Sequence, residues 1–229
     1  MAQHRAYSRP DKYTYNKMSL IHYIRKAYRG MRVVYYNSAR VYSHIVTTFK
    51  FHLNGVEFNS DFVGFGIPIL DINMEGKFTI GKGFWFNSGK YHAMGGRQQQ
   101  CYFVAAKGAE IVIGDNVGVT SIAIICHSKI AIGNNVKIGI NTVIYDTDFH
   151  SLDARIRNRV PESIDGVKSK PVTIMDGAFI GGHTTILKGV TIGKNSIVGA
   201  GSVVFKSIPD EQVWAGNPAV FIKENSYTS

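Results

Sequence analysis

His150 stands in the segment YDTDFHSLD, residues 145–153, together with Asp146, Asp148 and Asp153. A neutral imidazole, with a reference pKa of about 6.5, is well matched to accepting a proton near pH 7. A carboxylate can orient such a ring through its other nitrogen, and we predict Asp148 in this role. The alternative is a histidine that only closes a corner of the fold. These residue types therefore make His150 a candidate general base, and the surrounding elements must position it.

An aliphatic residue recurs every six positions in the C-terminal half of the chain. Six consecutive sites follow this spacing: Ile174, Ile180, Ile186, Ile192, Val198 and Val204. The positions four residues further on are small or slim: Ala178, Thr184, Val190, Ser196 and Ser202. Two earlier blocks share the spacing, one being Ile132, Ile138 and Ile144 and the other Ile113, Val119 and Ile125. One extra residue between the two blocks interrupts the phase.

This spacing excludes a helix and an ordinary strand. The apolar face of a helix recurs every three or four residues, and the side chains of a half-buried strand alternate with period two. A period of six is typical of a coil with short flat sides, in which one aliphatic residue per side points inward and a small residue forms the corner. Short strands of a β-sandwich are the alternative, but they do not hold so strict a phase. We therefore predict an all-β fold, a β-solenoid.

The regular pattern stops at His150. Counting six residues from Ile144 reaches this histidine, which puts an imidazole at a predicted inward position. Residues 151–171 carry no repeat, and we predict a loop expelled from the coil before Val172 resumes it in register. A long polar loop beside such a break favours a functional insertion. Residues 51–104 fit the repeat loosely, so we expect irregular coils there, one of them opened by Ile80.

The net charge of +10 is concentrated near the N-terminus. Residues 1–50 hold ten Lys or Arg against one acid, whereas residues 51–229 hold sixteen against fifteen. Within this arm, residues 18–38 place apolar side chains near one helical face and cations on the others, which predicts an amphipathic helix. Such a helix would contact an anionic membrane surface, or would pack on the solenoid or across an oligomer. Nucleic-acid binding is disfavoured, because the remaining chain is nearly neutral.

Composition narrows the class of protein further. The two cysteines, Cys101 and Cys126, form no C-x-x-C motif, which excludes a disulfide scaffold and a Cys-rich zinc site and favours a reducing cytoplasm. No apolar run of about 18 residues exists, and the N-terminus has no apolar signal region. We expect a cytoplasmic protein with a basic, partly helical arm (1–50), a solenoid domain (51–223) and a short tail (224–229).

Three sequence features resemble a known family. The [LIV]-G-x-x-x-x repeats, the segment IAIGNNVKIGINTVIYDTDFHSLD (130–153) and the final VWAGNPA are similar to the hexapeptide-repeat acyltransferases. The similarity is greatest to sugar O-acetyltransferases, such as those for galactosides, maltose, O-antigen and colanic acid, and it covers roughly residues 105–223. The resemblance implies a left-handed parallel β-helix, acetyl-coenzyme A as the acetyl donor, and a homotrimer with sites between subunits.

The resemblance also implies roles for single residues. His150 matches the general base of the family, and His127 lies on a coil that contributes to the acceptor pocket in relatives. The contacts to acetyl-coenzyme A map onto Gly182, Ala200, Gly201, Lys206, Gly216, Asn217, Pro218 and Lys223. Phe205 and Val220 depart from the family pattern, so the contacts at the adenine end are expected to differ and Lys223 to meet more of the phosphate charge.

Three further expectations concern residues outside this set. His183 is expected to be a packing residue, and Trp214 to cover the end of the coil. No metal is expected, because the zinc-dependent branch of this fold needs three histidines with two close together, and His127, His150 and His183 are widely spaced.

The predicted function is O-acetylation of a sugar hydroxyl in surface-polysaccharide assembly. The acceptor would be a sugar or a lipid-linked saccharide, and the protein would act in the cytoplasm, at the inner face of a bacterial membrane if the basic arm binds lipid. Two alternatives remain: N-acetylation of an amino sugar, in which the same histidine would serve, and a non-catalytic scaffold that only binds.

Overall fold

The computed structural model describes residues 20–89 and 99–226. The chain divides into two compact units, residues 1–38 and 39–229, and helix α1 (Leu20–Leu53) crosses the boundary between them. The predicted boundary at residue 50 lies further along the chain. Within the two described ranges, no helix combines the length and the hydropathy needed to cross a bilayer. Residues 1–19 of the basic arm and 227–229 of the tail lie outside the described residues.

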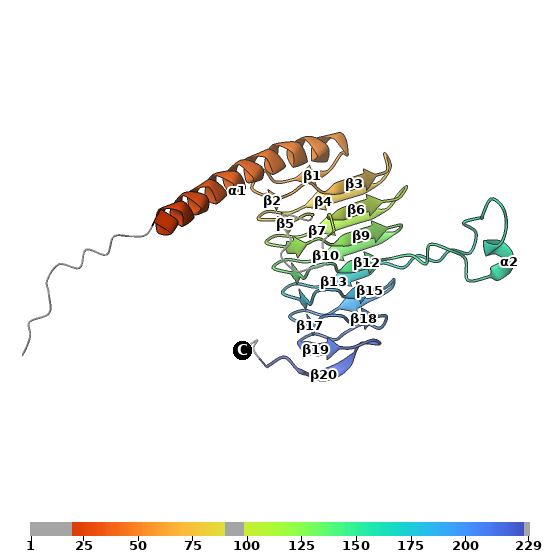
Figure 1. Ribbon diagram of the computed structural model, residues 1–229. Coiled ribbons are helices and arrows are strands. Elements are labelled where there is room, and N and C mark those ends of the chain that lie inside the picture. Colours follow the sequence, from red (N-terminus) through yellow and green to blue (C-terminus); the bar gives the residue numbers. More distant parts are fainter. Residues whose placement is uncertain (1–19, 90–98, 227–229) are drawn as a thin grey trace, which may run out of the picture. The chain divides into compact units, whose positions relative to one another are not determined.

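Three sheets form the sides of a solenoid (Figure 1). Sheet A consists of β1 (Glu57–Phe58), β4 (Lys77–Ile80), β7 (Glu110–Ile113), β10 (Lys129–Ile132), β13 (Val172–Ile174) and β16 (Thr191–Ile192). Sheet B consists of β2 (Val63–Phe65), β5 (Trp85–Asn87), β8 (Gly118–Thr120), β11 (Lys137–Ile138), β14 (Phe179–Ile180), β17 (Ile197–Val198), β19 (Gln212–Ala215) and β20 (Val220–Glu224). Sheet C consists of β3 (Ile69–Ile72), β6 (Tyr102–Ala105), β9 (Ala123–Cys126), β12 (Val143–Tyr145), β15 (Thr185–Ile186) and β18 (Val203–Val204).

Each turn of the chain visits sheets A, B and C in order. Neighbouring strands of one sheet therefore come from successive turns and pair in parallel. Among the strands of the described ranges, β19 and β20 at the C-terminal end are the one antiparallel pair. The architecture is a left-handed parallel β-helix, which confirms the fold predicted from the six-residue repeat and the family resemblance.

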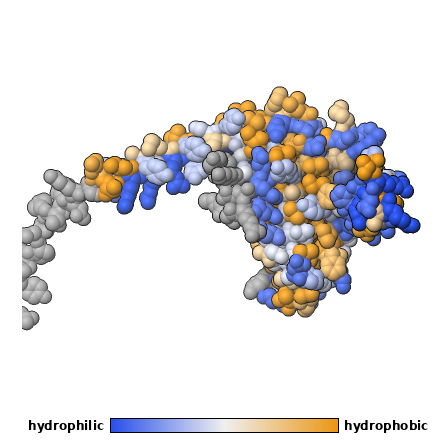
Figure 2. Space-filling view, turned by 45° about the vertical axis from the view of Figure 1, so that its right-hand side comes forward, coloured by the Kyte–Doolittle hydropathy of each residue, from blue (hydrophilic) through white to orange (hydrophobic). Residues whose placement is uncertain are grey.

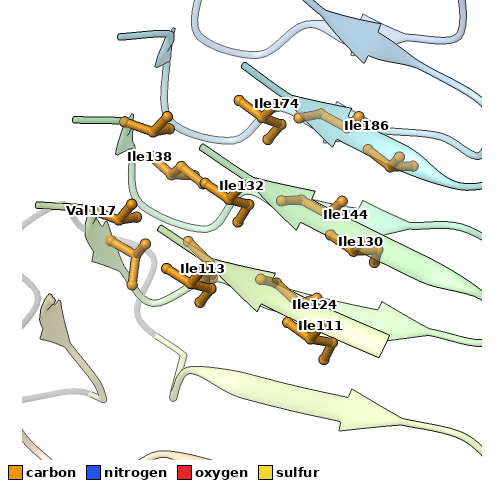
Figure 3. Close-up of a cluster of buried hydrophobic side chains, with 14 of the residues drawn as sticks. Ile111, Ile113, Val117, Ile124, Ile130, Ile132, Ile138, Ile144, Ile174 and Ile186 are labelled. Atoms are coloured by element: carbon orange, nitrogen blue, oxygen red, sulfur yellow. The ribbon is translucent and has the colours of Figure 1, made fainter. Parts of the chain in front are cut away.

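The inward side chains of successive turns stack into continuous ladders (Figure 3). Sheet A stacks Ile113, Ile132, Ile174 and Ile192, sheet B stacks Ile138, Ile180 and Val198, and sheet C stacks Ile144, Ile186 and Val204. Each of these side chains is at most 3% exposed. Full burial of one such side chain stabilises the folded state by about 1.5–3 kcal/mol. Each turn of the solenoid therefore adds its own share of the core.

Two details of the predicted repeat are wrong. Ile124, not Ile125, points into the core: it is fully buried and pairs with Ile144. The chain turns one residue early here, at Ser121, whose φ of 48° lies in the left-handed region. The described part of residues 51–104 is also more regular than expected. It forms six strands, and phenylalanines such as Phe86 and Phe103 take the buried positions that isoleucine takes below.

The corner between sheets A and B carries a ladder of Asp and Asn side chains. In three successive turns, one carboxylate or amide oxygen accepts a backbone N–H from the turn before, at 2.7 Å from Lys82 N to Asp115, 2.8 Å from Asp115 N to Asn134 and 2.6 Å from Asn134 N to Asp176. The residues that follow in the corner, Asn116 and Asn135, have φ of 58°, a conformation that Asn adopts more readily than most residues. These hydrogen bonds satisfy backbone N–H groups at the corners, which the short strands do not pair.

The last turns of α1 pack against the first coil. Ser43, Thr47 and Phe51 are buried, and the ring of Phe51 lies 5.1 Å from that of Phe58 and 5.4 Å from that of Phe62. Ser43 Oγ accepts a hydrogen bond from Gly66 N at 3.0 Å. The N-terminal end of the core is therefore covered by one face of residues 39–53.

Candidate active site

The inserted loop begins earlier than the sequence predicted. The expected range was 151–171, but β12 ends at Tyr145 and β13 begins at Val172, so the loop comprises residues 146–171. It leaves the solenoid at the corner between sheets C and A, and it extends away from the stacked coils (Figure 1). The coil resumes in register, as predicted, because Ile174 pairs with Ile132 of the preceding turn.

Backbone contacts close the neck of this loop. Thr147 and Ser169 form an isolated antiparallel bridge, and Lys170 N donates to Asp146 O at 2.8 Å. The two ends of the insertion are thus held together where they meet the coil.

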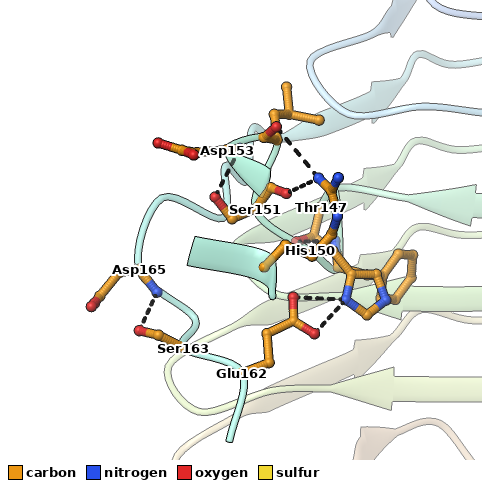
Figure 4. A network of polar contacts seen from close by, with 10 residues as sticks. Thr147, His150, Ser151, Asp153, Glu162, Ser163 and Asp165 are labelled. Atoms are coloured by element: carbon orange, nitrogen blue, oxygen red, sulfur yellow. Dashed lines mark hydrogen bonds and ion pairs between the residues drawn. The ribbon is translucent and has the colours of Figure 1, made fainter. Parts of the chain in front are cut away.

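His150 lies just beyond the neck and not in the core. Its side chain is 64% exposed, so the predicted inward position is wrong: the chain has left the coil before it reaches residue 150, and Ile174 takes the place in sheet A. His150 Nδ1 lies 3.0 Å from both carboxylate oxygens of Glu162 (Figure 4). A carboxylate can only accept, so Nδ1 carries the proton of this bond and Nε2 of the neutral ring presents its lone pair.

Asp148 does not orient this ring. Its carboxylate forms an ion pair with Lys188, which follows β15 on the next turn of the solenoid. The second oxygen, Oδ2, is buried and has no hydrogen-bond partner among the described residues. Asp148 therefore ties the neck to the coil. The residue that contacts the ring is Glu162, 12 residues beyond His150. Sequence analysis did not predict this contact, because the sequence does not reveal how the loop folds back.

Asp146 anchors the neck from inside. It is fully buried, and its carboxylate accepts backbone N–H groups of His127 and Ser128, each at 2.7 Å. The Cys126 thiol lies 3.4 Å from the same carboxylate. Burial, reinforced by the Asp146 charge, raises the pKa of Cys126 to about 12, so the thiol stays protonated and can donate to it.

We expect Asp146→Ala to destabilise the protein by about 2–5 kcal/mol, because two buried amides lose their acceptor and each unsatisfied group costs about 1–3 kcal/mol. Urea unfolding measures the change. Asp165→Ala is the matched control, because Asp165 is an exposed loop aspartate. A loss no larger than that of the control would show that the Asp146 contacts do not hold the neck.

The hydrogen bond from His127 N to Asp146 holds His127 beside the neck of the loop, near the residues that precede His150. The ring of Phe149, the residue before His150, lies 6.0 Å from the His127 ring and 5.1 Å from that of Tyr145. Phe149 has a φ of 64°, which is strained for an aromatic residue and is typical of functional sites. The prediction of His127 as an acceptor contact stays a prediction, but the structure places this residue at the neck.

Asp153 serves the fold of the loop. It caps α2 (Ala154–Arg157), accepting from Arg155 N at 2.8 Å, and it also pairs with the Arg155 guanidinium at 2.6 Å. These bonds from Arg155 hold the pKa of Asp153 below its usual value. Of the three aspartates near His150 in sequence, each therefore has its own structural contact.

In residues 20–89 and 99–226, no group of three His, Cys, Asp or Glu side chains could hold a metal ion.

Small residues line the corner between sheets B and C. Six of the positions matched to donor contacts gather here or directly below it: Gly182, Ala200, Gly201, Gly216, Asn217 and Pro218. Gly201 N donates to Gly182 O at 2.8 Å, and Gly216 N donates to Ser202 Oγ at 3.1 Å, so successive turns are joined along the corner. We call this set the small-residue corner. No large side chain stands at Gly182, Ala200, Gly201 or Gly216 along this corner.

Gly181 shows how tightly these turns stack. A Cβ at this position would meet the backbone nitrogen of Ala200 on the next turn. We expect Gly181→Ala to destabilise the protein by about 1–3 kcal/mol through overpacking, measured by urea unfolding. Gly30→Ala in α1 is the matched control, because nothing lies within 4 Å of the added Cβ and alanine is the better helix former. Equal stabilities of Gly181→Ala and the unmodified protein would contradict close stacking of backbones here.

The remaining donor positions lie elsewhere. Lys206 follows β18 at the corner between sheets C and A, with Nζ 5.6 Å from the Phe205 ring centre. Lys223 lies in β20, opposite Val213.

Trp214 is half-buried against the core and packs edge-on to Phe221 with ring centres 6.4 Å apart, so it closes the last coil as expected. His183 is exposed and has a φ of 60°, while its backbone N donates to Ile140 O.

His150 and the small-residue corner lie at opposite ends of sheet C. The loop leaves after β12, at the end of a sheet C strand, whereas Gly182 and Gly201 precede β15 and β18, at the start of sheet C strands. Within one chain, the histidine and the small-residue corner are thus on two different corners of the triangular coil.

Comparison with known proteins agrees with this architecture. Residues 171–206 match the family described as bacterial transferase hexapeptide (six repeats). The Saccharomyces cerevisiae protein YJL218W is 41% identical over 124 residues, 53% of this chain and 60% of that protein. The galactoside O-acetyltransferase of Escherichia coli K12 is 37% identical over 118 residues, 51% of this chain and 55% of that protein. The chain thus spans less than two thirds of the length of these curated relatives.

Solved structures share the fold at low sequence identity. The hexapeptide-repeat acetyltransferase VCA0836 from Vibrio cholerae has a TM-score of 0.54 at 21% identity and covers 92% of this chain and 95% of its own. The N-acyltransferase AntD from Bacillus cereus, solved with dTDP and 3-hydroxybutyryl-CoA, has a TM-score of 0.63 at 17% identity and covers 78% and 88%. The matched repeat, the relatives and the shared fold all support the resemblance to the hexapeptide-repeat acetyltransferases.

Proposed function

We propose that the protein transfers an acetyl group from acetyl-coenzyme A to a hydroxyl of a sugar, in the assembly of a surface polysaccharide. The observation that carries this proposal is the exposed His150 ring, whose Nδ1 is held by Glu162 at 3.0 Å and whose Nε2 is left to act as a base. The relatives that act on galactosides support a sugar acceptor, and the VCA0836 structure with acetyl-coenzyme A supports the donor.

The residues of the loop supply the proton transfer. The donor brings an already activated thioester, so no covalent link to the protein is required. Nε2 of His150 accepts the proton of the acceptor hydroxyl as that oxygen attacks the thioester carbonyl, and Glu162 stabilises the imidazolium that forms. The C–S bond then breaks, the acetyl group stays on the acceptor oxygen, and the imidazolium returns its proton to the coenzyme A thiolate. The neck bonds of Asp146 and the Lys188 ion pair of Asp148 fix the backbone on which the ring is mounted.

The small-residue corner fits the donor arm. The pantetheine portion of acetyl-coenzyme A is long and thin, and a corner built from Gly182, Ala200 and Gly201 admits it where larger side chains would not. Asn217 and Pro218 would extend the same path, and Lys223 would meet the phosphates. Lys206 lies at the other end of β18, so it would reach a donor on this corner only from a neighbouring copy.

A second copy of the chain would complete the site. His150 and the small-residue corner lie at the two ends of sheet C, and the outward residues of that sheet between β6 and β18 include no charged side chain: Tyr102, Val104, Ala123, Ile125, Val143, Tyr145, Thr185 and Val203. The outward positions of sheet A carry Lys77, Glu110 and Lys129 instead. An apolar sheet C face suits packing between copies in the proposed homotrimer, where the histidine of one copy meets the small-residue corner of the next.

The test is release of free thiol from acetyl-coenzyme A with a panel of acceptors. Galactosides and other neutral sugars should stimulate release, and the product should carry one additional ester. Stimulation by amino sugars with formation of an amide would move the assignment to N-acetylation. No stimulation by any acceptor, together with unaltered acetyl-coenzyme A, would favour a scaffold that only binds.

A further inference from the structure

Residues 20–38 of α1 expose an apolar stripe. Ile21, Ile24, Tyr28, Met31 and Tyr35 follow one another at spacings of three and four, which places them along one face of the helix. All are exposed, Met31 by 64% and Ile24 by 54%. Apolar surface in this amount, gathered on one face, marks an interaction site and not chance exposure.

Cations lie beside the stripe on the same helix, in a sequence that also exposes Tyr23, Val33 and Val34. Lys26 and Arg29 lie well to one side of the apolar stripe, whereas Arg25 and Arg32 lie along its border, and the sequence from Leu20 to Leu53 contains no Asp or Glu. Apolar and basic side chains lie on different sides of α1 (Figure 2). Tyr28 and Tyr36 place their rings 5.9 and 5.6 Å from the Arg32 guanidinium, so aromatic and cationic groups meet where the two faces join.

The packing of residues 39–53 on the solenoid does not use a stripe of this kind. The buried side chains there are Ser43, Thr47 and Phe51, whereas Tyr42, Ile45 and Phe49 are each more than 60% exposed. The helix therefore covers the first coil with a separate face, and the contact with the solenoid does not account for its apolar exposure.

We propose that α1 binds the surface of an anionic lipid bilayer. Its apolar stripe would enter the region between headgroups and acyl chains, and its cations would meet the anionic headgroups, at about fivefold in affinity for each Lys or Arg near the surface. Tyrosine, with an apolar ring and a polar tip, suits that boundary. Self-association of α1 fits less well, because coiled-coil helices pair acidic with basic side chains and this helix has only the latter.

The experiment is co-sedimentation of the full chain with lipid vesicles at low salt. Vesicles of equal parts phosphatidylglycerol and phosphatidylcholine should bind the protein, and vesicles of phosphatidylcholine alone should bind it far more weakly. Raising the salt to screen the charges should release it. The proposal does not depend on acetyl transfer, since binding is measured without donor or acceptor.

Two triple variants of equal net charge distinguish binding through α1 from binding through the overall positive charge of the protein. Arg25→Gln, Arg29→Gln and Arg32→Gln together should lower the partition coefficient on the anionic vesicles by roughly 100-fold, the product of three contributions. Lys82→Gln, Lys107→Gln and Lys194→Gln, which change exposed lysines of the solenoid, should leave it within about threefold of the unmodified protein. Met31→Ser with Ile24→Ser, which keeps every charge, should also weaken binding.

Three results would overturn the proposal. They are absence of binding to the anionic vesicles at low salt, equal losses in the two triple variants, and full binding by the Met31→Ser, Ile24→Ser variant. If the protein ignores vesicles but its mass in sedimentation falls when Met31 and Ile24 are changed, the stripe binds a second copy of the chain instead.

Discussion

His150→Ala is expected to lower kcat for acetyl transfer by about 10²- to 10⁴-fold, the usual contribution of a general base. The ring is held through Nδ1 by Glu162, and removing it leaves the acceptor hydroxyl without a proton acceptor. The side chain is 64% exposed, so its loss creates no cavity in the core and the fold should be unaffected. Thiol release from acetyl-coenzyme A with a saturating sugar acceptor measures the rate, and circular dichroism checks the fold.

Two further variants make this result specific. Glu162→Ala should lower kcat less than His150→Ala and leave KM for the donor unchanged, because Glu162 positions the ring and does not itself take the proton. His22→Ala, an exposed histidine of α1, should retain full activity in solution. If His150→Ala works at the rate of the unmodified protein, His150 has no part in the reaction.

Trimers that combine two inactive chains are expected to regain about one third of the full activity. One chain would carry His150→Ala, and the other Ala200→Trp, a bulky residue on the exposed small-residue corner. In a cyclic trimer with the site between copies, each mixed assembly holds one site with an intact histidine from one chain and an intact corner from the next, or about one site in three. Co-expression with two affinity tags, purification through both and the thiol assay give the measurement.

The two parent proteins set the baseline for this experiment. Each alone should be at least about 100-fold less active than the unmodified protein, the first for want of the base and the second because tryptophan fills the donor path. If mixed assemblies remain as inactive as the parents, the histidine and the small-residue corner of one chain must serve the same site. A single species smaller than a trimer would likewise contradict the assembly.

The ladder residues explain why the fold could be predicted from the sequence. Each inward Ile or Val of 174–204 depends only on residues within its own turn, and neighbouring turns repeat the same choice, so periodicity alone defines the core. The same reasoning predicted that the coil resumes in register after the insertion. It placed Ile125 inward in error, because the tight turn at Ser121 shortens one side by a residue and nothing in the six-residue pattern reports it.

The site was only partly predictable. His150 could be selected because it interrupts a regular pattern, but its position outside the coil and its contact with Glu162 depend on how an irregular loop folds back. Asp148, close in sequence, is instead taken by Lys188 from the following turn, a contact between residues 40 positions apart. Proximity in sequence is a poor guide where the chain leaves its repeat, since contacts there are long-range and specific to one loop.

The closed neck makes the insertion a separable module. Thr147 and Ser169 meet at its base, and the pairing of Ile132 with Ile174 continues the core as though nothing had been inserted. The proposed base and its carboxylate partner, His150 and Glu162, both lie on the far side of that junction. A graft of residues 147–170 onto another solenoid of this geometry would therefore carry both members of the proposed proton-handling pair in one segment, provided that the host places a cation where Lys188 pairs with Asp148.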